Sequence, residues 1–377
     1  MGRSIPIFIL MIGIMMMAAC SDSETVTDQD ADQSGHQSEQ TDESGDEGSD
    51  DQASEETSEK REQVNQKPFK AIEPPDDAKS LEDHYDDDEK ENMPDAEAHG
   101  ESTERSVPIG DVLSDGKEDL SDGPLKDHRL VAFYGTPRSE DMGILGEYEP
   151  EEMMEKLKEQ TAEYSKVDPG RPAVPMIELI ATVAQRTPGP DGTYVAEPSS
   201  DMIDEYAELA EENDALLMLD IQLGQSTVMD ELKEVESYLK LPHVHLAIDT
   251  EYSVGEGEIP GENLGEVDGE DIQEAVEYVD AMVEENNLPD KIVLVHQFGN
   301  GIVTNKDKIK PTEHVQVPLN YDGFGDPAIK MDAYGDLVRD QPIQYGGFKL
   351  FYQNDDPLLK PEEVLQLDPA PAVVNYQ

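Results

Sequence analysis

The chain has no tryptophan, a single cysteine and few basic residues, and each shortage excludes something. Among 377 residues, 27 are Lys or Arg and 88 are Asp or Glu, which gives a formal net charge of −61 at pH 7. A surface of this sign repels nucleic acid and anionic lipid, so we expect neither as a partner. The lone Cys20 cannot form a disulfide within the chain. An exported domain must therefore be held together by its hydrophobic core alone.

The first twenty residues, MGRSIPIFILMIGIMMMAAC, have the pattern of an export signal. Arg3 precedes an apolar stretch at residues 5–19 that is too short to span a bilayer comfortably, and small residues precede Cys20. Residues 1–19 resemble a bacterial lipoprotein signal peptide with MAAC (17–20) as its lipobox, although Leu is more usual than Met at the first lipobox position. The resemblance implies cleavage before Cys20, diacylation of its sulfur and a protein that is lipid-anchored to the cell membrane on the extracellular side. An ordinary secretory signal is the alternative.

Residues 20–125 have the composition of a spacer. Residues 21–128 hold 36 acidic and 9 basic side chains and few aliphatic ones, so they bury too little apolar area to offset the entropy of ordering. We expect a disordered, extended tether between the membrane and a folded domain. Two mixed stretches, 65–75 and 105–113, contain enough apolar residues to pack locally, and the second is suited to cover one end of the domain.

Residues 129–377 are as rich in acid as the spacer, with 52 acidic and 17 basic side chains. Like charges at this density repel one another unless salt screens them, and the Debye length falls to about 3 Å at 1 M salt. The composition therefore indicates a salt-loving or salt-tolerant source. An acidic surface without adaptive meaning is the alternative.

From residue 129 onward, short apolar runs alternate with amphipathic segments. The runs predict strands at 130–135, 173–183, 215–224, 244–252, 291–299, 314–323, 345–353 and 372–377. The amphipathic segments predict helices at 150–164, 199–213, 226–240, 268–286, 326–340 and 360–367, with a short element at 305–310. Eight strands alternating with helices predict a (β/α)8 TIM-like barrel over residues 126–377, irregular because no eighth helix follows the last strand. An open α/β sheet is the alternative, although no Gly-rich phosphate loop follows the first strand.

Two carboxylates end the fourth predicted strand, VHLAIDTEY (244–252). Side chains alternate across a strand, so Asp249 and Glu251 share one face while the aliphatic residues share the other. In a barrel the face against the helices must be apolar, so the carboxylates should point inward at the C-terminal mouth, where barrel active sites are built. His245 shares their face but lies deeper, and we expect it to be structural.

Polar residues also end most of the other predicted strands. These residues, which we expect to line the same mouth, are Tyr134, Glu178, Asp220, Gln222, His296, Gln297, Asn320, Asp322, Tyr352, Tyr376 and Gln377. Lys349 either faces the helices or pairs with a carboxylate at the mouth. Because Trp is absent, tyrosines such as Tyr134 and Tyr352 would have to provide any stacking surface for sugar rings.

Carboxylates crowded in a partly dry mouth repel one another, and this repulsion raises at least one pKa toward neutrality. A protonated acid beside an ionised partner is what glycoside hydrolysis requires. Asp249-Thr250-Glu251 resembles the Asp-x-Glu that ends strand four in the chitinase and phage-type lysozyme families of barrel glycosidases, and Asp220 matches their further Asp on an earlier strand. The resemblance implies that Glu251 is the general acid and Asp249 its orienting partner, with Asp220 assisting. The fuller Asp-rich chitinase signature is absent. Beyond this motif, the domain resembles uncharacterised lipoprotein domains of Gram-positive bacteria.

Three functions remain open at this point. The first is a surface-tethered hydrolase of cell-wall or extracellular glycan. The second is a non-catalytic glycan-binding, wall-binding or structural lipoprotein, in which the buried polar network only satisfies itself. The third is a divalent-metal hydrolase using Asp220, Asp249, Glu251 and His296, since such ligands suit Mg, Mn or Ca. No His-Glu-x-x-His zinc motif, nucleotide-binding glycine pattern or Gly-x-Ser-x-Gly motif occurs, so no further cofactor is expected.

Overall fold

The computed structural model describes residues 67–84 and 105–377. Cys20, the export signal and most of the expected tether lie outside the described residues, so cleavage and lipidation stay predictions. Within the described part of the chain, no helix is both long enough and apolar enough to cross a membrane.

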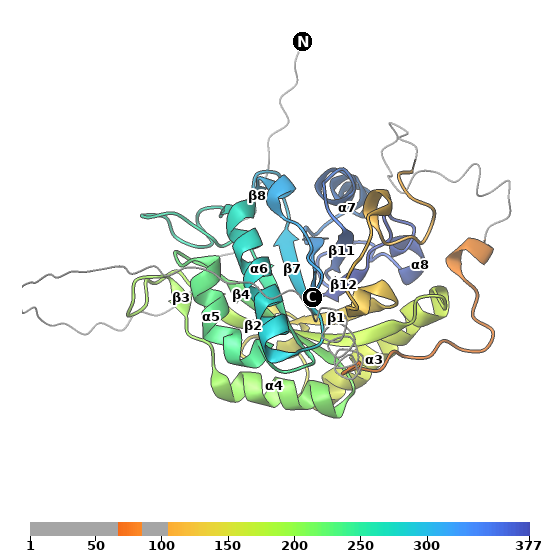
Figure 1. The fold of residues 1–377 in the computed structure, drawn as a ribbon, viewed down its shortest axis with the longest axis horizontal. Coiled ribbons are helices and arrows are strands. Elements are labelled where there is room, and N and C mark those ends of the chain that lie inside the picture. Colours follow the sequence, from red (N-terminus) through yellow and green to blue (C-terminus); the bar gives the residue numbers. More distant parts are fainter. Residues whose placement is uncertain (1–66, 85–104) are drawn as a thin grey trace, which may run out of the picture. The chain divides into compact units, whose positions relative to one another are not determined.

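Within the described residues, eight parallel strands form a closed barrel, as predicted (Figure 1). β1 pairs with both β2 and β12, which closes the ring and excludes the open sheet. In order around the barrel, the strands are β1 (Arg129–Gly135), β2 (Ala173–Ala184), β4 (Leu216–Gln222), β5 (Val244–Asp249), β7 (Lys291–Gln297), β10 (Pro318–Tyr321), β11 (Tyr345–Leu350) and β12 (Val373–Tyr376).

Helices pack around the outside of the barrel (Figure 1). They are α3 (Pro150–Val167), α4 (Ser200–Glu212), α5 (Val228–Leu239), α6 (Gly269–Asn286), α7 (Pro327–Tyr334) with the π-helix η7 (Gly335–Arg339), and α8 (Pro361–Val364). Side-chain caps define where three of the helices begin. Thr227, Asp268 and Asp326 accept backbone N–H groups in the first turns of α5, α6 and α7, respectively. Short 3-10 turns are η1 (Leu81–His84), η2 (Ser114–Gly116), η3 (Pro124–Lys126), η4 (Glu140–Met142), η5 (Ile144–Gly146) and η6 (Lys306–Lys308).

The connection from β7 to β10 is irregular, because its described residues contain η6 and no α-helix. Among the residues that the structure describes, four strands of only two residues lie in the connections between the barrel strands. They are β3 (Val195–Ala196), which pairs with β2, β6 (Val267–Asp268), which pairs with β8 (Val303–Thr304), and β9 (Val315–Gln316), which pairs with β7. The barrel was predicted to be irregular at its end, because no eighth helix follows the last strand. The connection between β7 and β10 is a second irregular place, in the middle of the chain.

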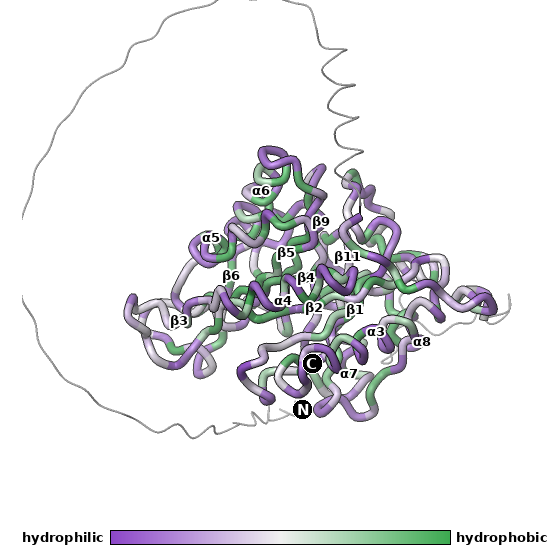
Figure 2. Tube along the Cα trace, turned by 90° about the horizontal axis from the view of Figure 1, so that it is seen from below, coloured by the Kyte–Doolittle hydropathy of each residue, from purple (hydrophilic) through white to green (hydrophobic). Residues whose placement is uncertain are grey.

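Side chains alternate between two apolar layers, and this alternation sets the direction of the polar residues. Val244, Leu246 and Ile248 of β5 belong to the layer between strands and helices. Ala247 belongs to a separate cluster inside the barrel, together with Met218 of β4. Figure 2 shows the layering, with hydrophobic residues along the central strands and hydrophilic ones on outer helices such as α5. The predicted outward face of β5 is therefore confirmed.

Parts of the expected tether belong to the folded domain. Val112 and Leu125 are members of the inner apolar cluster, and Phe69 packs against it. The Lys70 N–H donates to the Asp214 carbonyl, and the Ile72 N–H to the Ala173 carbonyl, so this segment covers the N-terminal end of the barrel. The expectation that 65–75 and 105–113 pack locally, the second over one end of the domain, is confirmed for their described residues, whereas the prediction of disorder is wrong for 76–84 and 114–125. These segments are ordered because their apolar side chains bury an end of the barrel that would otherwise be wet.

Candidate active site

Each barrel strand directs at least one polar side chain toward the C-terminal mouth. In several strands this side chain belongs to the last residues of the strand or to a residue just beyond it. Strand register brings these side chains together, because Gln222 is the partner of Asp249, Asp249 the partner of His296, and His296 the partner of Asn320. Hydrogen bonds, ion pairs and electrostatic contacts join them into one group, here called the mouth cluster. Its members are Tyr134, Glu178, Asp220, Gln222, Asp249, Glu251, His296, Asn320, Asp322, Lys349 and Asn375.

A buried ion pair between Glu178 of β2 and His296 of β7 forms the most enclosed part of the mouth cluster. Glu178 Oε1 lies 2.7 Å from His296 Nε2, and both side chains are at most 1% exposed. Asn375 donates to the other Glu178 oxygen, and Asp322 Oδ2 lies 3.4 Å from His296 Nδ1. Burial alone lowers the pKa of His296, but Glu178 and Asp322 outweigh it and raise that pKa well above its usual value. The imidazole therefore stays protonated at neutral pH.

Asp220 and Asp249 each have one satisfied oxygen and one open oxygen. The Tyr134 hydroxyl donates to Asp220 Oδ2 at 3.0 Å, and Gln222 Nε2 donates to Asp249 Oδ2 at 3.0 Å. The Oδ1 atoms of both carboxyls are buried without a hydrogen-bond partner. Burial and the charge of Asp249 raise the pKa of Asp220 well above its usual value. Asp220 is therefore shifted toward its protonated form.

Asp249 and Glu251 titrate near neutrality. Burial, followed by the charge of Glu251, raises the pKa of Asp249 to about 7. Burial, followed by the charge of Asp322, raises the pKa of Glu251 to about 7, against the opposing effects of Tyr252 and Lys349. Glu251 follows β5 and is less buried than Asp249. The outermost of these acids therefore exchanges its proton at physiological pH.

Lys349 of β11 points into the mouth, which settles the alternative left open by the sequence. Its Nζ lies 3.4 Å from the centroid of the Tyr134 ring, and the residue is 4% exposed. Its positive charge lowers the pKa values of Asp220, Asp249 and Glu251. Lys349 thus limits how far these carboxyls shift toward the neutral form.

Four predicted site residues lie outside the mouth cluster, and one of them, Gln377, is joined to β11 and the loop after it by backbone hydrogen bonds to Leu350 and Tyr352. Gln297 donates its amide to the Leu337 carbonyl of η7, in the outer layer. The Tyr376 hydroxyl lies 2.7 Å from the Tyr164 hydroxyl, also in the outer layer. Tyr352 is 42% exposed, and its ring stacks on that of Tyr376 with centroids 5.1 Å apart. These placements follow from strand alternation, since each inward residue is followed by an outward one.

Sequence analysis missed Asn375, because Val373 and Val374 are apolar on opposite faces of β12 and leave its parity open in the sequence. Asn375 stands between Val374 and Tyr376, both of which pack in the outer layer, so its amide must point inward to Glu178. Parity assigns Lys349 in the same way, because Phe348 and Leu350 face outward. His245 accepts the Ile292 N–H at its Nδ1, and burial and Lys291 lower its pKa well below the usual value, which agrees with a structural role.

The metal-hydrolase alternative lacks a preformed ligand set. Among residues 67–84 and 105–377, no group of three or more His, Cys, Asp or Glu side chains is arranged to hold a metal ion. Within the mouth cluster, Tyr134, Gln222 and Asn375 each donate to one oxygen of Asp220, Asp249 and Glu178, respectively.

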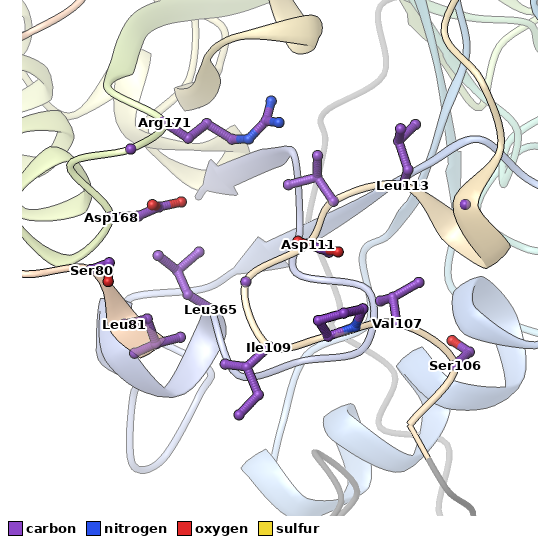
Figure 3. A pocket seen from close by; sticks show the side chains of 15 residues that line it. Ser80, Leu81, Ser106, Val107, Ile109, Asp111, Leu113, Asp168, Arg171 and Leu365 are labelled. Carbon is purple, nitrogen blue, oxygen red and sulfur yellow. The ribbon is translucent and has the colours of Figure 1, made fainter. Parts of the chain in front are cut away.

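A cavity of about 570 Å³ lies at the other, N-terminal end of the barrel (Figure 3). Apolar side chains such as Leu81, Ile109 and Leu365 line it, together with Asp168 and Arg171 from the connection between α3 and β2. No residue of the mouth cluster lines this cavity. The cavity and the mouth cluster are therefore separate features of the domain.

Comparison with known proteins adds little to this geometry. No protein-family model and no curated protein matches the chain. Among solved structures, the mutant form of Thermotoga maritima Cel5A in complex with cellobiose matches with a TM-score of 0.38 and 11% identity, over 70% of this chain and 91% of that chain. The assignment of a closed (β/α)8 barrel rests on the strand pairing described above.

Proposed function

We propose that the mouth cluster is the catalytic centre of a glycoside hydrolase acting on cell-wall or extracellular glycan, carried by a lipoprotein anchored through Cys20. The observation that supports this proposal is the convergence of Asp220, Asp249 and Glu251 at the mouth, with two of the three pKa values raised to about 7. Glycoside hydrolysis needs one carboxyl that is protonated and a second that carries charge.

Glu251 is the residue best suited to be the general acid. It lies beyond the end of β5, on the outer side of the more buried Asp249, so a glycosidic oxygen reaches it first. A carboxyl with a pKa near the working pH transfers its proton efficiently in either direction. Asp249, held by Gln222, then supplies the negative charge that stabilises an oxocarbenium-like transition state.

Exposed aromatic rings beside the mouth support a sugar ligand. Phe324, in the loop after β10, is 63% exposed and packs edge-on against Phe351 with centroids 5.7 Å apart. Tyr352 is exposed in the loop after β11. Aromatic faces of this kind are suited to stacking on the apolar side of a pyranose ring, and they replace the missing tryptophans. The overall acidity of the chain favours neutral over anionic glycans.

The substitution Glu251→Gln tests the assignment of the general acid. We expect it to reduce release of reducing sugar from cell-wall glycan by about 10²- to 10⁴-fold, because only the proton-transfer step is lost. The melting temperature should stay nearly unchanged, since Gln keeps the shape of Glu. Glu256→Gln, in the exposed loop that follows, is the matched control and should keep full activity.

Full activity of the Glu251→Gln protein would overturn this assignment. If the unaltered protein retains a glycan but never cleaves it, the non-catalytic binding alternative is correct instead.

A further inference from the structure

We propose that Thr250 and Gly265 are positioning residues that hold the backbone of Glu251 from two sides, so that its carboxyl meets the substrate in one orientation. The inference rests on the proposed function, because it deepens the role given to Glu251. Neither residue touches the reacting atoms. Each acts through the turn that carries Glu251.

The turn begins directly after β5 and needs support, because Glu251 lies outside the strand ladder. The Ser253 N–H donates to the Thr250 carbonyl at 3.3 Å, which closes a turn with Glu251 and Tyr252 at its centre. A side chain on such a turn is oriented only as well as the turn is anchored.

Thr250 provides the first anchor, toward the barrel. It is fully buried, and its hydroxyl donates to the carbonyl oxygen of His296 on β7 at 2.6 Å. The bond ties the start of the turn to the strand that carries the ion-paired imidazole. The middle residue of Asp249-Thr250-Glu251 therefore fixes the position of the residue after it.

Gly265 provides the second anchor, from the far end of the loop. Its N–H donates to the Glu251 carbonyl at 2.8 Å, and the next residue, Glu266, donates to the Ser253 carbonyl at 2.9 Å. Gly265 is buried, whereas its neighbours Leu264 and Glu266 are exposed. The loop after β5 thus returns to clamp the turn from which it departed.

Only glycine fits at residue 265. A Cβ atom there would lie 2.4 Å from the Ser253 nitrogen and 2.7 Å from the Glu251 carbonyl oxygen, both of which are backbone atoms that cannot rotate away. Gly265→Ala must therefore displace the turn. Gly255 lies in the same loop, and its added Cβ would meet only the side chain of Glu258 at 3.5 Å, an ordinary contact. Gly255→Ala is the matched control.

The experiment compares Thr250→Val, Thr250→Ser, Gly265→Ala and Gly255→Ala by two independent readouts. The first is the titration of the Glu251 carboxyl, followed by NMR of ¹³C-labelled glutamate side chains and identified by its absence from the Glu251→Gln protein. We expect the midpoint to move by about half a pH unit or more in Thr250→Val and Gly265→Ala, because the carboxyl changes its distance to Asp249 and Lys349. Thr250→Ser and Gly255→Ala should keep the original midpoint.

The second readout is the steady-state kinetics on the hydrolysed glycan. Misplacing a catalytic group by about 1 Å costs roughly 10²-fold in rate. We therefore expect kcat to fall about 10- to 100-fold in Thr250→Val and Gly265→Ala, with KM changed less than about threefold and rescue by Thr250→Ser. If the titration midpoint of Glu251 is unchanged in a folded Thr250→Val protein, the inference is overturned. This test remains valid even if the Gly265→Ala protein fails to fold. A shifted midpoint in a protein that cleaves no glycan supports the positioning role and refutes the hydrolase proposal separately.

Discussion

Replacing Glu178 by Gln removes the negative partner of His296 while keeping the shape of the side chain. The two charged atoms lie 2.7 Å apart and are shielded from water, so solvent screening does not weaken their interaction. Removing one member of such a buried pair costs about 3–5 kcal/mol, because the other charge is left without compensation. Asp322 Oδ2 remains 3.4 Å from the imidazole and partly compensates its charge, so we expect a loss at the lower end of this range, about 3 kcal/mol.

The loss should depend on pH in a defined direction. The pKa of His296 in the folded protein lies well above the ordinary value of 6.5. A group shifted upward stabilises the fold fully below its unfolded pKa, and this contribution disappears as the pH rises through the folded pKa. The difference in unfolding free energy between the two proteins should therefore be largest at pH 6 and smaller at pH 9.

Urea unfolding of both proteins at pH 6 and pH 9 measures this difference directly. At the lower pH we expect a loss of about 3 kcal/mol, or a fall in Tm of roughly 6 to 12 °C. Glu236→Gln is the control, because its pair with Lys240 has the same 2.7 Å separation but lies at the surface, where a pair contributes at most about 1 kcal/mol. A loss below 1 kcal/mol at pH 6 for Glu178→Gln, or an equal loss at both pH values, would refute the buried ion pair.

Two further outcomes follow from the charges at the mouth and from the export signal. Lys349→Met removes a charge that lowers the pKa values of Asp249 and Glu251, so both should rise above about 7, and the basic limb of the pH–activity profile should move to higher pH. A limb that stays in place or moves down would contradict the electrostatic role of Lys349. Cys20→Ser should move the protein from the membrane fraction to the medium and abolish incorporation of labelled palmitate, since anchoring depends on acylation of that sulfur. Continued membrane retention without acylation would show that another part of the chain binds the membrane.

Sequence periodicity predicted the strands closely but left their last residues ambiguous. Asp249 and Glu251 were assigned inward because three aliphatic residues of the same strand mark the opposite face. At the end of β12, Tyr376 looked like a mouth residue, whereas the structure turns it outward to Tyr164. A polar or aromatic residue at a strand end has no apolar neighbour beyond it to define the parity, so both faces remain compatible with the sequence.

The two ends of the domain show a similar division. Composition separated an acidic leading region from an alternating α/β region and indicated that 65–75 and 105–113 could pack, but it did not indicate that Leu125 also joins the core. Phe69 and Val112 are sparse apolar residues in a charged context, and local sequence indicates that they cannot form a core of their own. They become ordered because the N-terminal end of the barrel offers an apolar surface made by strands far along the chain.

The sequence by itself determined the class of fold and the inward direction of the β5 carboxyls, because both follow from the local periods of strands and helices. Only the tertiary structure decided which charges meet. Glu178 and His296 are 118 residues apart, and Lys349 of β11 reaches Tyr134 of β1, which lies two strands away in the ring. Such pairs depend on the register of every strand between them and on the closure of the barrel, and no local pattern specifies either.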